Sequence, residues 1–133
     1  MWRGLVAGVG LTLLLAGCGS QKNYANDPRP PSPISITAAV FPHRISVSPP
    51  RFGAGPITLT IANLSSKSLS VTLDAQSNND APAKSGPINP QGTAVISVDV
   101  KPGSYTLKSS RSGSTTLKVG PKRPSAQDQV LLP

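Results

Sequence analysis

Ile57-Thr58-Leu59-Thr60-Ile61-Ala62-Asn63 is the stretch of sequence that decides the fold. Its apolar residues alternate with Thr and Ala, and a period of two residues is typical of a β-strand with one buried face. Gly53-Ala54-Gly55-Pro56 precedes the strand and predicts a turn, and the polar residues 63–66 predict another turn after it. The stretch therefore predicts a half-buried strand between two turns.

The same alternation occurs in six further segments. Two of them precede the stretch and four follow it, at residues 34–40, 44–48, 69–73, 94–100, 105–107 and 117–119. No stretch after residue 18 has a convincing helical period, and Thr, Ser and Val dominate over helix formers. Seven short strands separated by Gly and Pro turns predict an all-β fold, a single small Greek-key β-sandwich of about seven strands.

The N-terminal segment has the features of a signal peptide. Arg3 supplies a positive charge, and Gly4 to Leu15 is a run of twelve residues dominated by Leu, Val, Ala and Gly. A transmembrane helix needs roughly 17–25 mainly apolar residues. Because the run ends at the small and polar residues 17–20, it is too short to span a membrane.

The end of this segment, Leu15-Ala16-Gly17-Cys18, resembles the lipobox of bacterial lipoproteins. The resemblance implies that Cys18 becomes the first mature residue and carries a thioether-linked diacylglycerol, and that Leu15, Ala16 and Gly17 are the signal-peptidase recognition residues. It also implies a lipid-anchored protein on the extracytoplasmic face of the cell membrane, or on the outer membrane in a host with two membranes. An ordinary secretory signal, with Cys18 left as a free thiol, is the alternative.

Four segments follow from these observations. Residues 1–17 are the expected signal peptide, and residues 18–33 are the lipidated cysteine and a proline-rich linker that favours an extended polyproline II conformation. Residues 34–119 are the predicted β-sandwich domain, and residues 120–133 are a predicted flexible C-terminal tail. The mature chain is long enough for one domain, which we expect to be a monomer.

Basic residues outnumber acidic ones by a wide margin. The chain has 13 Lys and Arg against 5 Asp and no Glu, for a net charge of +8, and loss of Arg3 leaves +7. Such a surplus favours anionic lipid headgroups, anionic wall polymers or nucleic acid. The basic residues are scattered, and aromatic residues are too few for the stacking surface of a nucleic-acid-binding protein, so we expect no nucleic-acid partner.

Two stretches resemble secreted cupredoxin-like domains. Residues 45–63, with Pro49 and the Gly53-Ala54-Gly55-Pro56 segment, look like the first half of such domains. Residues 100–107 resemble the Pro-Gly-x-Tyr strand that leads into the family's copper loop. Pro-Gly-x-Tyr strands also occur in transthyretin-like and immunoglobulin-like sandwiches, so the resemblance leaves the cupredoxin-like and immunoglobulin-like topologies open.

The copper ligands of that family do not carry over. Where the family has its first His, this chain has Ser65-Ser66-Lys67-Ser68-Leu69, and where it has Cys, His and often Met, this chain has residues 109–114, five serines and glycines around Arg111. A type 1 copper site needs a thiolate and two imidazoles. His43 is the sole histidine and Cys18 is expected to be lipidated, so we expect no metal and no cofactor.

Other candidates for chemistry are few. His43 is a labile metal ligand at most, and Asp74, Asn78, Asn79 and Asp80 offer oxygens for calcium without the spacing of an EF-hand. A serine nucleophile would need His43 close to Asp74 or Asp99. We therefore expect no catalytic residues and no enzyme.

Three functions remain. The first is an envelope lipoprotein with a non-enzymatic β-sandwich that binds an envelope protein or serves a structural role, with the loops Asp74 to Gly92 and Ser109 to Ser114 as the places where a partner would bind. The second is a cupredoxin-related accessory to a copper or electron-transfer partner. The third is a basic adhesion element that binds anionic wall polymers.

Overall fold

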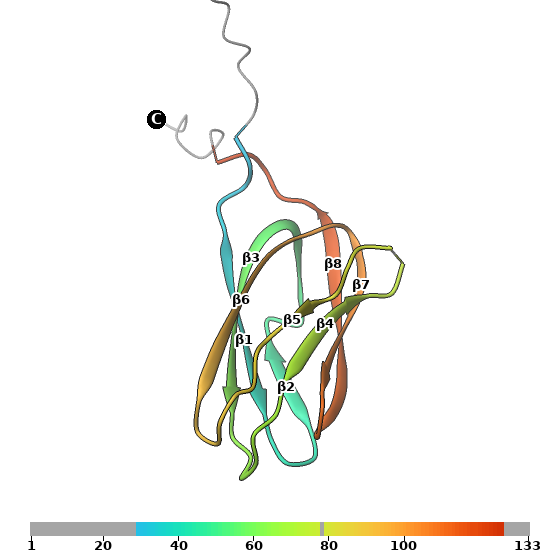
Figure 1. Ribbon diagram of the computed structural model, residues 1–133. Helices are drawn as coiled ribbons and strands as arrows, with labels where there is room; N and C mark the ends of the chain where they lie inside the picture. The colour runs from blue at the N-terminus through green and yellow to red at the C-terminus, as the bar shows by residue number, and fades with distance from the viewer. Residues whose placement is uncertain (1–28, 78, 127–133) are drawn as a thin grey trace, which may run out of the picture.

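Eight β-strands and no helix form in residues 29–77 and 79–126, the part of the chain that the computed structural model describes (Figure 1). No helix long and apolar enough to cross a membrane occurs within these residues. The predicted all-β fold is confirmed, with one two-residue strand more than expected. The strands are β1 Ile34–Val40, β2 Ile45–Ser48, β3 Arg51–Asn63, β4 Val71–Ala75, β5 Ala83–Lys84, β6 Thr93–Val100, β7 Gly103–Ser109 and β8 Gly113–Lys122.

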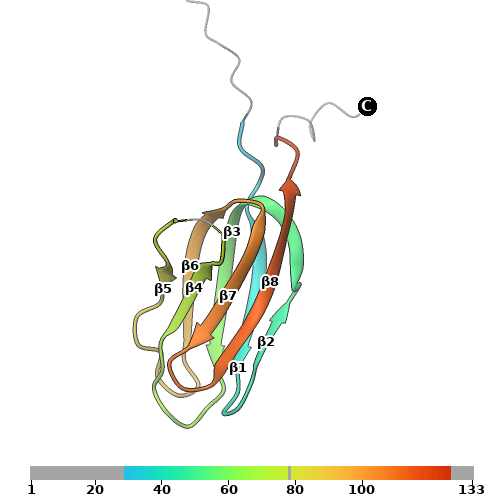
Figure 2. The same cartoon turned by 90° about the vertical axis from the view of Figure 1, so that its right-hand side faces the viewer.

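The strands form two sheets that pack face to face. The first sheet has the order β2-β1-β3-β6, and the second has the order β3-β8-β7-β4-β5. Two neighbouring pairs, β1 with β3 and β3 with β8, are parallel, and the others are antiparallel. In Figure 2, β7 and β8 of the second sheet lie in front of β1 and β3 of the first.

Strand β3 belongs to both sheets. Its first residues, 51–54, pair with β8, and the residues from Gly55 onward pair with β6 and β1. The predicted turn at residues 53–56 is therefore corrected: the chain reverses direction here while it stays in the strand. A register shift between Gly53 and Ala54 and a φ of 131° at Gly55, which favours glycine, make this reversal feasible.

The core lies between the sheets and is built from both. Its fully buried side chains are Ile, Leu and Val at the inward positions of the alternation, among them Ile36, Leu59, Ile61, Val71, Leu107 and Leu117. Tyr105 is 7% exposed, and its hydroxyl accepts a hydrogen bond from the Lys101 backbone N–H at 3.0 Å. The Tyr of the Pro-Gly-x-Tyr strand thus closes the core below the β6–β7 connection.

One core residue comes from the predicted loop between residues 74 and 92. Ile88 is 2% exposed and exchanges two backbone hydrogen bonds with Leu69, at 3.1 and 2.7 Å. The short strand β5 lies in the same segment and pairs with β4. The segment is therefore held along the edge of the second sheet at several points.

The two ends of the domain also differ from the expected boundaries. Strand β8 continues to Lys122, past residue 119, and the last described part of the linker, residues 29–33, contacts the domain through the buried Pro31. The expected signal peptide and lipidation site, Leu15, Ala16, Gly17 and Cys18, lie outside the described residues, as does the end of the predicted tail after residue 126.

Candidate functional site

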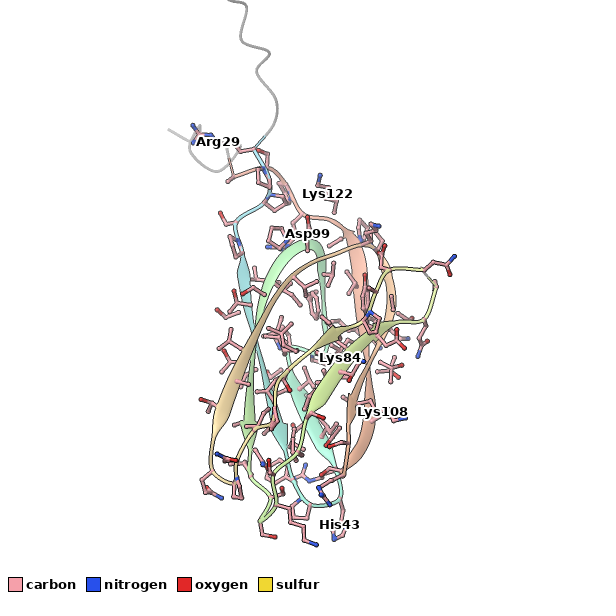
Figure 3. All side chains as sticks on the ribbon, in the orientation of Figure 1. Arg29, His43, Lys84, Asp99, Lys108 and Lys122 are labelled. Atoms are coloured by element: carbon pink, nitrogen blue, oxygen red, sulfur yellow. The ribbon has the colours of Figure 1, made fainter. Side chains whose placement is uncertain are left out.

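The sandwich has two distinct ends. At one, the tether end, residues 29–33 lead into β1 and residues 123–126 follow β8. At the other, the loop end, three connections meet: residues 41–44, 64–68 and 109–113. Figure 3 shows Arg29 and Lys122 at the tether end and His43 at the loop end, with the whole length of the sheets between them.

Arg123 organises the tether end. Its Nε donates to the carbonyl oxygens of Gly53 and Ala54 at 3.1 and 3.3 Å, while Nη1 donates to the Ser32 carbonyl and Nη2 to the Pro56 carbonyl. A Cβ on Gly53 would lie 2.6 Å from Arg123 Cγ, so the glycine is needed for this approach. One guanidinium therefore joins the linker, the reversal in β3 and the C-terminal segment, all far apart in sequence.

Asn63 organises the loop end. The side chain is fully buried, and its Nδ2 donates to the carbonyl oxygens of Lys67 and Ile88 at 2.8 and 2.9 Å. Its Oδ1 accepts from the backbone N–H of Ser65 at 2.9 Å and from the Ser65 hydroxyl at 2.7 Å. The amide thus fixes the 64–68 connection against the segment that leads into β6.

A hollow of about 270 Å³ lies between the three connections of the loop end. Its walls are Pro42, His43, Ser65, Ser66, Lys67, Arg111 and Ser112. Arg111 Nε donates to the Ser68 carbonyl at 2.9 Å, which holds its side chain across the hollow's edge. Ser112 is 5% exposed, and its hydroxyl has no hydrogen-bond partner within the described residues. The lining is polar and basic, and it contains no carboxylate.

The structure separates the residues that the sequence singled out for chemistry. His43 lies in the loop-end hollow, whereas Asp99 lies at the tether end (Figure 3) and Asp74 lies on the outer surface of the second sheet. Asp80 pairs with Lys101 at 3.0 Å, and both side chains are exposed. No group of three His, Cys, Asp or Glu that could hold a metal ion occurs among the described residues, a range that omits Asn78.

The two loops predicted to bind a partner occupy different places. The β7–β8 turn within Ser109 to Ser114 lies at the loop end, next to His43. The segment from Asp74 to Gly92 is divided. Asp80 contacts Lys101 in the β6–β7 connection, while Ile88 and Gly92 contact the loop end through Leu69 and Asn63. The two loops therefore do not form one continuous binding edge.

A larger hollow, which the sequence did not reveal, lies on the outer face of the second sheet. This trough of about 450 Å³ is lined by Ser70, Thr72, Asp74, Pro82, Lys84, Thr106, Lys108, Ser109 and Ser110. Lys84 comes from β5 and Lys108 from β7, with β4 between them. Only the strand pairing brings these lysines together, because they lie on strands that are far apart in the sequence.

Comparison with known proteins gives structural similarity without a family. No family model matches the sequence, and no curated protein matches it significantly. Reduced auracyanin from the photosynthetic bacterium Roseiflexus castenholzii is similar with a TM-score of 0.47 at 14% identity, over 68% of this chain and 99% of that one. A multicopper oxidase is similar with a TM-score of 0.46 at 14% identity, over 74% of this chain and 46% of the oxidase. The fold described above is established by the strand pairing itself.

Proposed function

We propose that the protein is a lipid-anchored lipoprotein of the bacterial cell envelope, held on the extracytoplasmic face by a diacylglycerol on Cys18, whose β-sandwich is a non-enzymatic binding module. The lipobox-like residues 15–18 support the anchor. The main observation behind the proposed orientation of the module is the arrangement of the tether end. The linker that connects the domain to Cys18 enters the domain at this end, where Arg123 binds it. The loop end then points away from the lipid surface.

The spacer between the domain and the lipid is shorter than the whole linker, because the described part of the linker contacts the domain. Residues 29–33 contact the domain, so residues 18–28 remain to separate it from the lipid. At about 3 Å per residue, these residues have a reach of roughly 30 Å. A module at that distance has room for a partner on its sides and at its loop end.

The groups that line the loop-end hollow are a further observation behind the proposed binding role. A serine nucleophile needs a histidine base and an acid that orients it. The hollow offers His43 beside Ser65, Ser66 and Ser112, but its lining has no acidic residue. The hydroxyl, imidazole and cationic groups of this hollow suit hydrogen bonding to a polar ligand.

The anchor is tested by intact-mass analysis of the protein extracted from membranes of its own host. We expect a mature chain that begins at residue 18 and carries a diacylglycerol. The variant Cys18→Ser should lose this mass and be released from the membrane, whereas Ser20→Ala, two residues away, should remain lipidated. An unmodified wild-type chain in the medium would contradict the proposal and leave Cys18 as a free thiol.

An accessory role beside a copper or electron-transfer protein is the second candidate. It rests on the stretches that resemble cupredoxin-like domains, which form the strand shared by both sheets and the strand that carries the buried Tyr105. Affinity purification from the host membrane should then recover a metalloprotein. Recovery of none would leave the lipid-anchored binding module as the function.

A further inference from the structure

The two outer faces of the sandwich share one composition but differ in charge. Both are rich in Ser and Thr, because these residues occupy the outward positions of the alternation. The described outer face of the first sheet carries Asp99 and no basic residue. The outer face of the second sheet carries four basic residues, Arg51, Lys84, Lys108 and Lys118, against the single carboxylate of Asp74.

The strand register gathers these cations. Arg51 on β3 is directly opposite Lys118 on β8. Thr72 on β4 is opposite Lys108 on one side and Lys84 on the other. Since neighbouring strands lie about 4.8 Å apart, the Lys84 and Lys108 backbones are separated by roughly 10 Å with the Thr72 side chain between them. The trough therefore has an ammonium group on each side and hydroxyls along its floor.

The fold does not neutralise these charges internally. Among residues 29–77 and 79–126, the Lys101–Asp80 contact is the one ion pair, and it lies outside this face. Like charges directly opposite on neighbouring strands are destabilising. The Arg51–Lys118 pair therefore disfavours folding, and an external anion would relieve the repulsion.

We propose that the trough and the adjoining cations of the second sheet bind a linear, phosphate-bearing polyanion. A chain-like ligand fits because two cations flank the hollow and a second pair, Arg51 and Lys118, lies on the same face four residues farther along the strands, where Lys118 is opposite Ser104. Nucleic acid is disfavoured because no aromatic side chain on this face can stack on a base. The proposal rests on the role of a binding module, while the chemistry of the face is independent of the lipid.

Binding of linear polyphosphate to the detergent-purified full chain tests the proposal. We expect affinity that falls steeply with salt, because each neutralised phosphate releases counterions. The variant Lys84→Gln/Lys108→Gln should lose about tenfold in affinity, and its logarithmic salt slope should fall by about 1.4 for two lost contacts at ~0.7 each. The control Arg44→Gln/Lys122→Gln removes the same charge from exposed sites off this face and should change the affinity less than about twofold.

A second variant separates position from net charge. Adding Ser46→Lys and Ser97→Lys to the Lys84→Gln/Lys108→Gln chain restores the net charge on the outer face of the first sheet, where both serines are exposed and lie on the two edge strands rather than on either side of one residue. The lost affinity should not return. Its return, or equal losses in the test and control variants, would show that only net charge matters and would overturn the proposal.

Two further outcomes are decisive. No binding of polyphosphate at physiological salt, or binding to vesicles of anionic phospholipid in place of polyphosphate, would also overturn it. The measured affinity for polyphosphate does not depend on whether the chain carries a lipid on Cys18. Cys18→Ser should bind polyphosphate like the wild-type chain, and Lys84→Gln/Lys108→Gln should remain in the membrane.

Discussion

The two ends of the sandwich are each held by one polar side chain, but the two side chains work differently. Arg123 only donates, is partly exposed, and joins segments up to 91 residues apart in sequence. Asn63 both donates and accepts, is fully buried, and satisfies all four of its hydrogen-bonding positions within the loop end. The tether end is thus secured by long-range contacts that water can replace, and the loop end by a network centred on a side chain that is shielded from water.

The largest effect is expected at the loop end. Asn63→Ala removes four hydrogen bonds and leaves the buried backbone N–H of Ser65 without its acceptor. An unsatisfied buried polar group costs about 1–3 kcal/mol, so we expect the free energy of unfolding in urea to fall by about 3 kcal/mol. Asn89→Ala, at an exposed site in the neighbouring segment, should change it by less than ~0.5 kcal/mol. Equal effects of the two substitutions would show that the hydrogen bonds of Asn63 do not stabilise the loop end, and the contrast with the tether end would no longer hold.

A smaller loss is expected at the tether end. Arg123→Met removes the charged donors from four carbonyls, but several of these can bind water instead. We expect a loss of about 2 kcal/mol in urea unfolding, with faster amide exchange in residues 51–57, where the strand reverses. The neighbouring exposed Lys122→Met is the control. A loss larger than that of Asn63→Ala would reverse the comparison.

The unpartnered hydroxyl of Ser112 should behave in the opposite way. It is buried and has no hydrogen-bond partner among residues 29–77 and 79–126, so Ser112→Ala removes a group that is costly to bury and leaves stability unchanged or slightly higher. Ser109→Ala is the matched substitution in the same turn, because the Ser109 hydroxyl accepts from the Arg111 N–H at 3.3 Å. Thermal unfolding should rank Ser109→Ala below Ser112→Ala, and the reverse order would show that Ser112 has a partner in solution.

The smallest effect concerns the exposed ion pair near the tether end. The hydrogen bond and charge of Asp80 raise the pKa of Lys101 above its ordinary value. The resulting stabilisation is fully present below the pKa of an unfolded lysine and is lost as the pH rises through the raised pKa of the folded state. NMR titration of the Lys101 side chain should show a lower pKa in Asp80→Asn. An unchanged pKa would mean that the pair does not persist in solution.

The strands followed from the sequence because the core is built by simple alternation. Residues 34–40 were predicted with the bounds that the structure has, the second strand was predicted one residue too early, and the stretch 57–61 lies at the centre of the sheet interface. The extension of β3 to Arg51 was missed because Gly and Pro at residues 53–56 indicate a turn, and the pattern does not show that the chain can reverse while remaining paired. Ile88 was missed because a single apolar residue among polar ones has no period.

The polar features were less accessible to sequence analysis. Arg123 lies in the segment predicted as a flexible tail, and its acceptors are backbone carbonyls, which every sequence contains. The loop around residues 109–114 was placed at a sheet end, and His43 was identified, but their proximity depends on the fold. The trough depends on the register of three strands, which brings Lys84 and Lys108 to either side of Thr72. The two lysines are 24 positions apart in the sequence, and no pattern in the sequence indicates that they lie near each other.

The parallel pairing of β1 and β3 has a mechanical consequence. If a polymer is held on the second sheet and a lipid on Cys18 anchors the chain, the two attachments would pull on the domain in opposite directions. The pulling force would then reach the domain at the start of β1 and act along the axis of this strand. Seven residue pairs join β1 to β3, and four more join it to β2 on the other side. A force along the strand loads these hydrogen bonds together in shear, rather than opening them one after another. A strand paired on both sides in this way is therefore suited to bear a pulling force along its axis.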